Sequence, residues 1–209
     1  MSLARPRQGD ALLYVDAIAR ATPFSTWPRP VLERLLQSAT LSRHRAGTVL
    51  VVGGRHCDAL TVVVEGTALS TVSHPGGRRV TFKVDASSRA YGLLPLVDGK
   101  PMPNDLIADG PVVGLRIPHT AIRAELSRMP SLWESVAVDV TERARRYAEQ
   151  MKQFVFDPPL IRAASLLLAL ASHGEGTAAD GPVVIGMRLS QERLAEMLGI
   201  SRQWVSSLV

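Results

Sequence analysis

The sequence predicts an α+β chain that contains an antiparallel β domain, one long helix and a C-terminal pair of short helices. Three observations support this fold class. Glycine and proline divide residues 41–123 into short β-branched runs. Residues 131–154 contain neither glycine nor proline, and residues 190–205 contain two helix starts separated by Gly199. We therefore expect three regions, at residues 1–130, 131–156 and 157–209.

The composition indicates an ordinary globular protein with a basic surface. Of 209 residues, 24 are Lys or Arg and 19 are Asp or Glu, which gives a formal net charge of +5. The chain is 46% hydrophobic and 21% charged, so it is not a disordered or low-complexity polymer. Its one cysteine, Cys57, excludes an internal disulfide and a cluster held by four cysteines. This cysteine usage favours the cytoplasm, and no apolar run approaches the length of a membrane helix, so we expect a soluble protein.

Two amphipathic helices are predicted before the β domain. Their apolar residues recur at helical spacing, and Pro23 and Pro28 separate the two stripes. The stripes are Leu12, Val15, Ile18 and Ala19, and then Val31, Leu32, Leu35 and Leu36.

The β domain is predicted from five runs of strand-forming residues at nearly regular spacing. The runs are residues 48–52, 60–64, 68–72, 80–84 and 112–117. Short strands divided in this way are typical of an antiparallel sandwich or barrel.

One long helix is expected to begin after Ser131, which can cap it, and to reach Phe154. Its large or apolar residues recur at alternating intervals of three and four, as in a coiled coil. These residues are Trp133, Val136, Val140, Ala144, Tyr147, Met151 and Phe154. The stripe either packs on the β domain or pairs with its twin in a homodimer, and we favour the homodimer.

The segment after the long helix contains a predicted hinge at residues 157–159, where two prolines follow Asp157. Residues 161–173 are predicted to form an apolar buried helix, and residues 183–187 a short strand.

The last twenty residues predict a helix-turn-helix. Ser190 and Ser201 can each cap a helix, and Gly199 is suited to the left-handed turn between them. Ala195 permits close packing of the two helices, and Val205 anchors the second one. The alternative is an ordinary pair of packed helices with a structural role only. The basic charge of the chain and an exposed Arg-Gln start favour double-stranded DNA as a partner.

This order of parts resembles the Crp/Fnr family of bacterial transcription regulators. The most specific match is residues 189–206, and residues 53–66 also resemble the family's β domain. The resemblance implies a jelly-roll-like β-roll that senses an effector, a dimerisation helix and a winged-helix DNA-binding domain. It also implies a homodimer, with RNA polymerase as a further candidate partner. The chain stops at Val209, within the second helix and before the wing that the resemblance implies, so we expect either that the natural protein continues or that this form was cut short.

Family members that bind cyclic AMP use a glutamate for the ribose, and an arginine followed by a hydroxyl residue for the phosphate. Here Leu93 stands at the acid's position, Met102 at the arginine's and Pro103 at the hydroxyl's. Loss of a charge-assisted bidentate contact weakens phosphate binding strongly. We therefore expect no binding of cyclic AMP or cyclic GMP, although Lys100 offers an alternative, weaker charge partner.

The resemblance assigns two sets of candidate binding residues. The candidate effector pocket comprises Gly92, Leu93, Leu94, Met102, Pro103, Asn104, Arg146 and Tyr147. The alternative for the last two is that Arg146 is a solvated surface residue and Tyr147 belongs only to the apolar stripe. The candidate DNA-binding residues are Ser190, Ser201, Arg202, Gln203, Ser206 and Ser207. Because Ser207 replaces a second family arginine, we expect a different half-site.

We expect no cofactor, because one cysteine and a histidine beside Pro-Gly-Gly favour neither an iron–sulfur cluster nor haem. The leading hypothesis is a homodimeric DNA-binding regulator with an unidentified small effector. The alternative is a sensor or scaffold that does not bind DNA and uses the β domain for a partner or ligand. No nucleophile, zinc or phosphate-loop motif indicates an enzyme.

Overall fold

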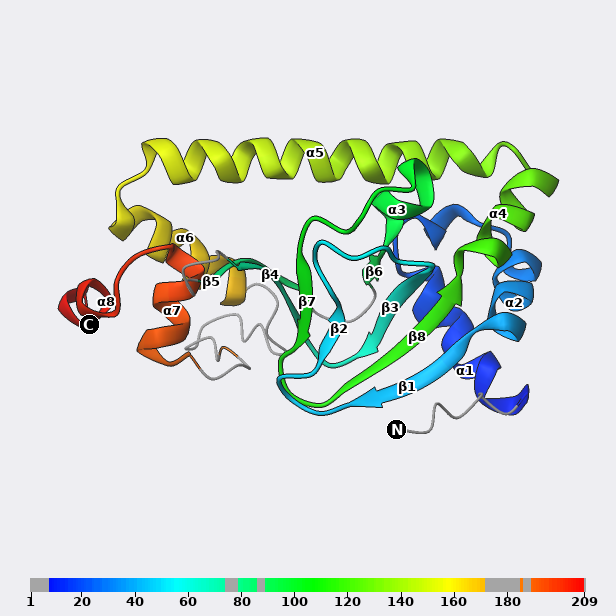
Figure 1. Cartoon of the computed structure of the whole chain (residues 1–209), viewed down its shortest axis with the longest axis horizontal. Helices are drawn as coiled ribbons and strands as arrows, with labels where there is room; N and C mark the ends of the chain where they lie inside the picture. Colours follow the sequence, from blue (N-terminus) through cyan, green and yellow to red (C-terminus); the bar gives the residue numbers. More distant parts are fainter. Residues whose placement is uncertain (1–7, 74–78, 86–88, 172–184, 186–188, 209) are drawn as a thin grey trace, which may run out of the picture.

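The computed structural model of the chain describes residues 8–73, 79–85, 89–171, 185 and 189–208. Figure 1 shows one long helix along the length of the molecule, with the β domain beneath its first half. The C-terminal helices lie near its other end (Figure 1). The predicted α+β class is confirmed.

The helices and strands follow the predicted order. The helices are α1 (Gln8–Ala19), η1 (Phe24–Thr26), α2 (Arg29–Ser38), α3 (Leu93–Asp98), α4 (His119–Arg128), α5 (Leu132–Phe156), α6 (Pro159–Ala171), α7 (Gln191–Leu198) and α8 (Arg202–Leu208). The strands are β1 (Thr40–His44), β2 (Val49–Val51), β3 (Ala59–Glu65), β4 (Ala68–Ser73), β5 (Arg79–Asp85), β6 (Arg89–Tyr91), β7 (Asp105–Ala108) and β8 (Val112–Pro118).

The strands form two antiparallel four-stranded sheets, in the orders β1-β8-β3-β6 and β2-β7-β4-β5. A smaller hydrophobic cluster, which includes Val63, Leu106 and Val112, contains residues of both sheets. A larger cluster joins the first sheet to α1, α2, α4 and the start of α5. The β domain therefore has one core inside the roll and a second core under its helices.

All five predicted runs form strands, but three strands, two α-helices and the short helix η1 were not predicted. Strands β1, β6 and β7 are short, and β1 is mostly half-buried, so hydrophobic alternation is weak there. Helix α4 carries a readable signal, because the buried Ile122 and Leu126 are one turn apart and follow Pro118. The two apolar residues are too few for the helical spacing to stand out beside the preceding strand pattern.

An ion-pair cluster joins α2 to α4 at the edge of the larger core. Glu125 is buried and accepts bonds from Arg34 Nε at 3.0 Å and Arg34 Nη2 at 2.6 Å. Arg128 Nη1 bonds the same carboxylate at 2.5 Å. The hydrogen bonds from Arg34 lower the pKa of Glu125 below its usual value. This carboxylate therefore stays ionised at neutral pH, with both of its oxygens engaged.

Helix α5 is anchored to the β domain at its beginning. Leu132 and Val136 belong to the larger core, and Trp27 Nε1 donates to Ser135 Oγ at 2.7 Å. Two expectations for this helix were wrong. Ser131 makes no side-chain capping bond, because its backbone is already helical. Val136 is buried in its own chain, so it does not belong to an exposed stripe.

The segment beyond α5 differs from its prediction in one respect. Helix α6 forms, but Leu160, Ile161 and Leu168 are exposed rather than buried. Hydropathy predicts burial, whereas these three side chains remain exposed among the residues that the structure describes. The strand predicted at residues 183–187 lies outside the described residues. No helix in the described part of the chain has the length and apolar content needed to cross a membrane.

Candidate functional site

A small cavity lies where the β-roll meets the middle of α5, and it is called the roll pocket here. Its volume is about 170 Å³. It is lined by Ser70, Tyr91, Gly92, Leu93, Leu94, Met102, Asn104, Val140, Arg143, Ala144 and Tyr147. Six of the residues predicted for an effector pocket are thus brought together, namely Gly92, Leu93, Leu94, Met102, Asn104 and Tyr147.

Gly92 positions the inner wall of the roll pocket. Its φ of +94° lies in the left-handed region, and a Cβ atom there would be 2.6 Å from the carbonyl oxygen of Ala59. Only glycine fits both conditions. The turn directs Leu93 into the larger core, where it is buried.

The positions expected to hold a nucleotide's charged contacts are apolar and packed. Leu93 is a member of the larger core and Met102 of the smaller one. Neither side chain offers a hydrogen-bond donor to a phosphate or an acceptor to a ribose hydroxyl. The wall that these two residues form is suited to an apolar group.

Arg143 supplies positive charge to the roll pocket and was missed in the sequence. Its Nε donates to Asp139 Oδ2 at 2.6 Å, and its Nη2 donates to the carbonyl oxygen of Ala90 at 2.9 Å. The guanidinium is thus fixed between α5 and β6. The sequence contains a pattern that indicates this position, because Asp139, Arg143 and Tyr147 are spaced by four and share one face of α5.

Two predicted pocket residues do not line the cavity. Arg146 precedes Tyr147 by one position, which turns it about 100° around the helix, and it lies 3.6 Å from Glu142. Pro103 is exposed between Met102 and Asn104, which both face inward. The rotation of α5 and the turn before β7 place these two residues outside the cavity lining, and their role in effector binding stays a prediction.

An apolar stripe runs along the exposed side of α5. It begins at the half-exposed Trp133 and includes Tyr147, Met151 and Phe154, of which Met151 is 68% exposed. Val140 is half-buried beside the roll pocket. Ala137, rather than Val136, continues the stripe, since it is exposed and four positions after Trp133. With Ala137 in place of Val136, the stripe keeps its alternating spacing of three and four residues.

The helix-turn-helix has the predicted local geometry. Ser190 Oγ accepts a bond from the backbone N–H of Arg193 at 3.2 Å, and Ser201 Oγ accepts one from Trp204 at 3.2 Å. Gly199 has φ +65° and ψ +33°, and Ile200 N–H bonds Ala195 O at 3.1 Å. Together these contacts end α7 and start α8 within three residues.

The predicted DNA-binding residues lie on the exposed surface of this motif. Ser190, Ser201, Arg202, Gln203, Ser206 and Ser207 are all exposed. Ser207 Oγ donates to Trp204 O at 2.7 Å, so its hydroxyl is engaged within α8. Trp204 is 38% exposed. Arg193 instead faces the β domain, where its Nη2 pairs with Asp109.

Phe154 connects the long helix to the turn of this motif. A Cβ at position 199 would lie 2.7 Å and 2.8 Å from two atoms of the Phe154 ring. The Arg162 guanidinium lies 4.6 Å from the centre of the same ring, and Arg162 Nη1 donates to Phe154 O at 3.2 Å. One aromatic side chain therefore touches α6 and the turn between α7 and α8.

A metal-binding cluster was sought among the described residues. No group of three or more His, Cys, Asp or Glu side chains is arranged there to hold a metal ion. Cys57 Sγ lies 2.8 Å from the carbonyl oxygen of Ala59 and is half-buried.

Comparison with known proteins matches both parts of this architecture. Residues 41–129 match the cyclic nucleotide-binding domain family, and residues 161–209 match the Crp-like helix-turn-helix domain family. A CRP-like cAMP-activated global transcriptional regulator of Mycobacterium tuberculosis is 24% identical over 160 residues. The match covers 77% of this chain and 71% of that protein.

Two solved structures share the fold over most of their length. The c-di-GMP responsive global regulator CLP of Xanthomonas campestris superposes with a TM-score of 0.73 at 18% identity, covering 87% of this chain and 89% of that one. FixK2 of Bradyrhizobium japonicum gives a TM-score of 0.70 at 15% identity, covering 81% of each chain. With a β-roll, a long helix and a capped helix pair in the matched order, the chain belongs to the Crp/Fnr family of DNA-binding transcription regulators.

Proposed function

We propose that the protein acts as a homodimer in which the roll pocket binds a small effector other than cyclic AMP or cyclic GMP. One observation carries this proposal. Val140, Ala144 and Tyr147 line the roll pocket and also belong to the apolar stripe of α5. A ligand in the pocket would therefore press directly on the side chains that face the partner copy. Such a contact gives the ligand different affinities for two arrangements of the dimer, as a switch requires.

The size and lining of the roll pocket support an effector that differs from a cyclic nucleotide. A volume of about 170 Å³ is below the roughly 300–1,000 Å³ of most ligand sites. Leu93 and Met102 occupy the positions of the family's ribose and phosphate contacts with packed apolar groups. Arg143 faces the pocket but already bonds Asp139 and the backbone of β6. A compact, mainly apolar ligand with one polar group fits these features best.

We expect millimolar cyclic AMP to leave the melting temperature of the full chain unchanged. A ligand present at 100 times its Kd adds about 2.7 kcal/mol to the unfolding free energy, which is readily seen in a thermal melt. Cyclic GMP should behave in the same way, and 5′-AMP serves as the control for nonspecific nucleotide effects. A clear rise with cyclic AMP that Arg143→Gln abolishes would overturn the proposal and assign the phosphate to Arg143.

The C-terminal helices are proposed to bind one DNA half-site in each copy, with α8 in the major groove. Arg202 and Gln203 are exposed in the first turn of α8, where side chains reach base edges. Arginine pairs with guanine and glutamine with adenine in the major groove. Ser190, Ser201 and Ser206 are proposed to contact phosphates, which position the protein but carry no sequence information.

Gln203→Ala should relax the preference for one base while leaving nonspecific binding intact. The expected cost at the preferred site is about 1–3 kcal/mol, or about five- to 150-fold in Kd. The measurement is fluorescence anisotropy at fixed salt, with a duplex that the unaltered protein has selected from a random pool. Gln153→Ala in α5 makes the same chemical change away from α8 and is the control. Unchanged selectivity in the Gln203 variant would exclude a base contact by this side chain.

A further inference from the structure

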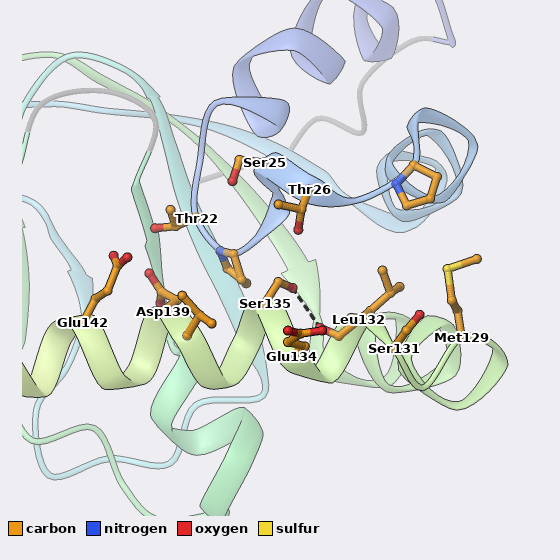
Figure 2. Close-up of a pocket in the computed structure, with 13 residues that line it drawn as sticks. Thr22, Ser25, Thr26, Met129, Ser131, Leu132, Glu134, Ser135, Asp139 and Glu142 are labelled. Atoms are coloured by element: carbon orange, nitrogen blue, oxygen red, sulfur yellow. Dashed lines mark hydrogen bonds between the residues drawn. The ribbon is translucent and has the colours of Figure 1, made fainter.

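A second and larger cavity lies on the opposite side of α5 from the apolar stripe. It is called the acidic cavity here, and its volume is about 580 Å³. Its walls are the start of α5 and the segment from Thr22 to Pro28 that joins α1 to α2, as Figure 2 shows. This volume lies within the range of small-molecule sites, and the roll pocket takes no part in it.

The lining of the acidic cavity is unusual for a chain of net charge +5. Three of the described residues that line it are acidic, five carry a hydroxyl group, and none is a lysine, arginine or histidine. The acids are Glu134, Asp139 and Glu142, and the hydroxyl residues are Thr22, Ser25, Thr26, Ser131 and Ser135. Such a surface offers hydrogen-bond acceptors and negative charge, which favour a cation.

Asp139 gives the cavity a buried acceptor without a partner. Its side chain is 1% exposed, and only its Oδ2 is bonded, to Arg143. Among the described residues, nothing donates a hydrogen bond to its Oδ1. Figure 2 shows the carboxyl groups of Asp139 and Glu142 pointing toward the hydroxyl of Thr22. An unpaired buried carboxylate oxygen is costly, and an ammonium group is a donor that would satisfy it.

A second acidic side chain, Glu134, lies at the other end of the cavity, at a distance from Glu142 that α5 fixes. Glu134, Val138 and Glu142 are spaced by four along α5, so they form one row. Eight residues of helix separate the two glutamates by about 12 Å. Val138, together with Pro23 and Leu132, provides apolar surface between the acidic ends. Acid, aliphatic surface and acid in a row match a chain of methylene groups with an ammonium at each end.

We propose that the acidic cavity binds a linear polyamine. One terminal ammonium lies among Asp139, Glu142 and Thr22, the methylene chain lies on Val138, and the other ammonium meets Glu134. Arg143 already pairs with Asp139 Oδ2, and Arg146 Nη1 lies 3.6 Å from Glu142 Oε2, so the ammonium would bind to Asp139 Oδ1 and share Glu142 with Arg146. The ligand would join the segment from Thr22 to Pro28 to α5, on the side of α5 away from the proposed partner copy.

Isothermal titration calorimetry of the full chain with spermidine tests this proposal. We expect saturable binding that is stronger than that of putrescine, whose shorter chain reaches one acidic end only. Magnesium chloride at the same ionic strength should give no saturable heat. Equal behaviour of spermidine, putrescine and magnesium would overturn the proposal, because it would indicate unspecific attraction to acidic groups.

Variants locate the binding and keep the test independent of folding. Glu134→Gln and Glu142→Gln alter exposed side chains, and each should weaken the spermidine Kd by about three- to tenfold. Glu149→Gln makes the same change on α5 outside the cavity and should leave the Kd unchanged. Asp139→Asn should weaken binding as well, and if it fails to fold, the two glutamate variants decide. Equal losses in the Glu149 variant and the cavity variants would exclude the site.

Discussion

Met151→Asp is expected to convert the protein from a dimer to a monomer and to weaken its binding to duplex DNA by about 100-fold or more. Met151 is 68% exposed and lies in the apolar stripe of α5, where its twin would face it in a dimer. Removing two such side chains from an interface costs about 1.5–3 kcal/mol each. Two facing carboxylates add repulsion and desolvation, so the dimer Kd should rise by at least about 1,000-fold.

Val138→Asp is the matched control for this prediction. Val138 is also an exposed aliphatic residue of α5, with 51% of its surface accessible, but it faces the acidic cavity rather than the stripe. Its substitution should leave the dimer intact. Analytical ultracentrifugation measures the assembly, and fluorescence anisotropy with a selected duplex measures DNA binding. A Met151 variant that remains a dimer would show that the stripe is not the dimer interface.

Features that depend on residues close together in the chain could be predicted from the sequence. The caps and the turn of the helix-turn-helix were predictable, because caps and left-handed glycines act within a few positions of the chain. Ser190, Gly199 and Ser201 each satisfy backbone groups of their own helix ends. The five longest runs of β-branched residues were predictable for a similar reason, since each strand's pattern is local.

Features that depend on packing between distant segments were not predictable in this way. Val136 and Ala137 are both compatible with a three-and-four spacing, and only the rotation of α5 on the β domain decides which one is buried. The same rotation turns Arg143 into the roll pocket and Arg146 away from it. The acidic cavity also requires α5 to meet a segment more than one hundred residues earlier in the chain. Spacing along a single helix contains no information on that meeting.

Gly199→Val is the second substitution with a large expected effect, and it tests how α5 is coupled to α8. Gly199 has φ +65°, a conformation that a β-branched residue adopts only with strain of about 1–3 kcal/mol. A side chain there also meets the Phe154 ring, which must be displaced. We expect α7 and α8 to lose about 2–4 kcal/mol of local stability. Hydrogen exchange of their amides measures this loss directly.

Gly47→Val separates the strain from the contact with Phe154. Gly47 has φ +78°, but no atom lies within 4 Å of a Cβ built there, so its variant reports backbone strain alone in the turn before β2. A loss at Gly199 no larger than the loss at Gly47 would count against a significant contact with Phe154. Adding Phe154→Leu to Gly199→Val should recover the difference between the two losses, as a double-mutant cycle would show.

The result of the Gly199→Val and Phe154→Leu cycle would show how an effector signal reaches the DNA-binding helices. Phe154 lies two turns beyond Tyr147, which lines the roll pocket, and its ring contacts the turn that orients α8. A rigid helix that is in contact at both ends moves them together, whereas an unpacked Phe154 would leave the helix pair free to turn independently. Recovery by Phe154→Leu would therefore identify this ring as the physical connection between pocket and recognition helix. Without that recovery, coupling would have to pass through another contact, such as the ion pair between Arg193 and Asp109.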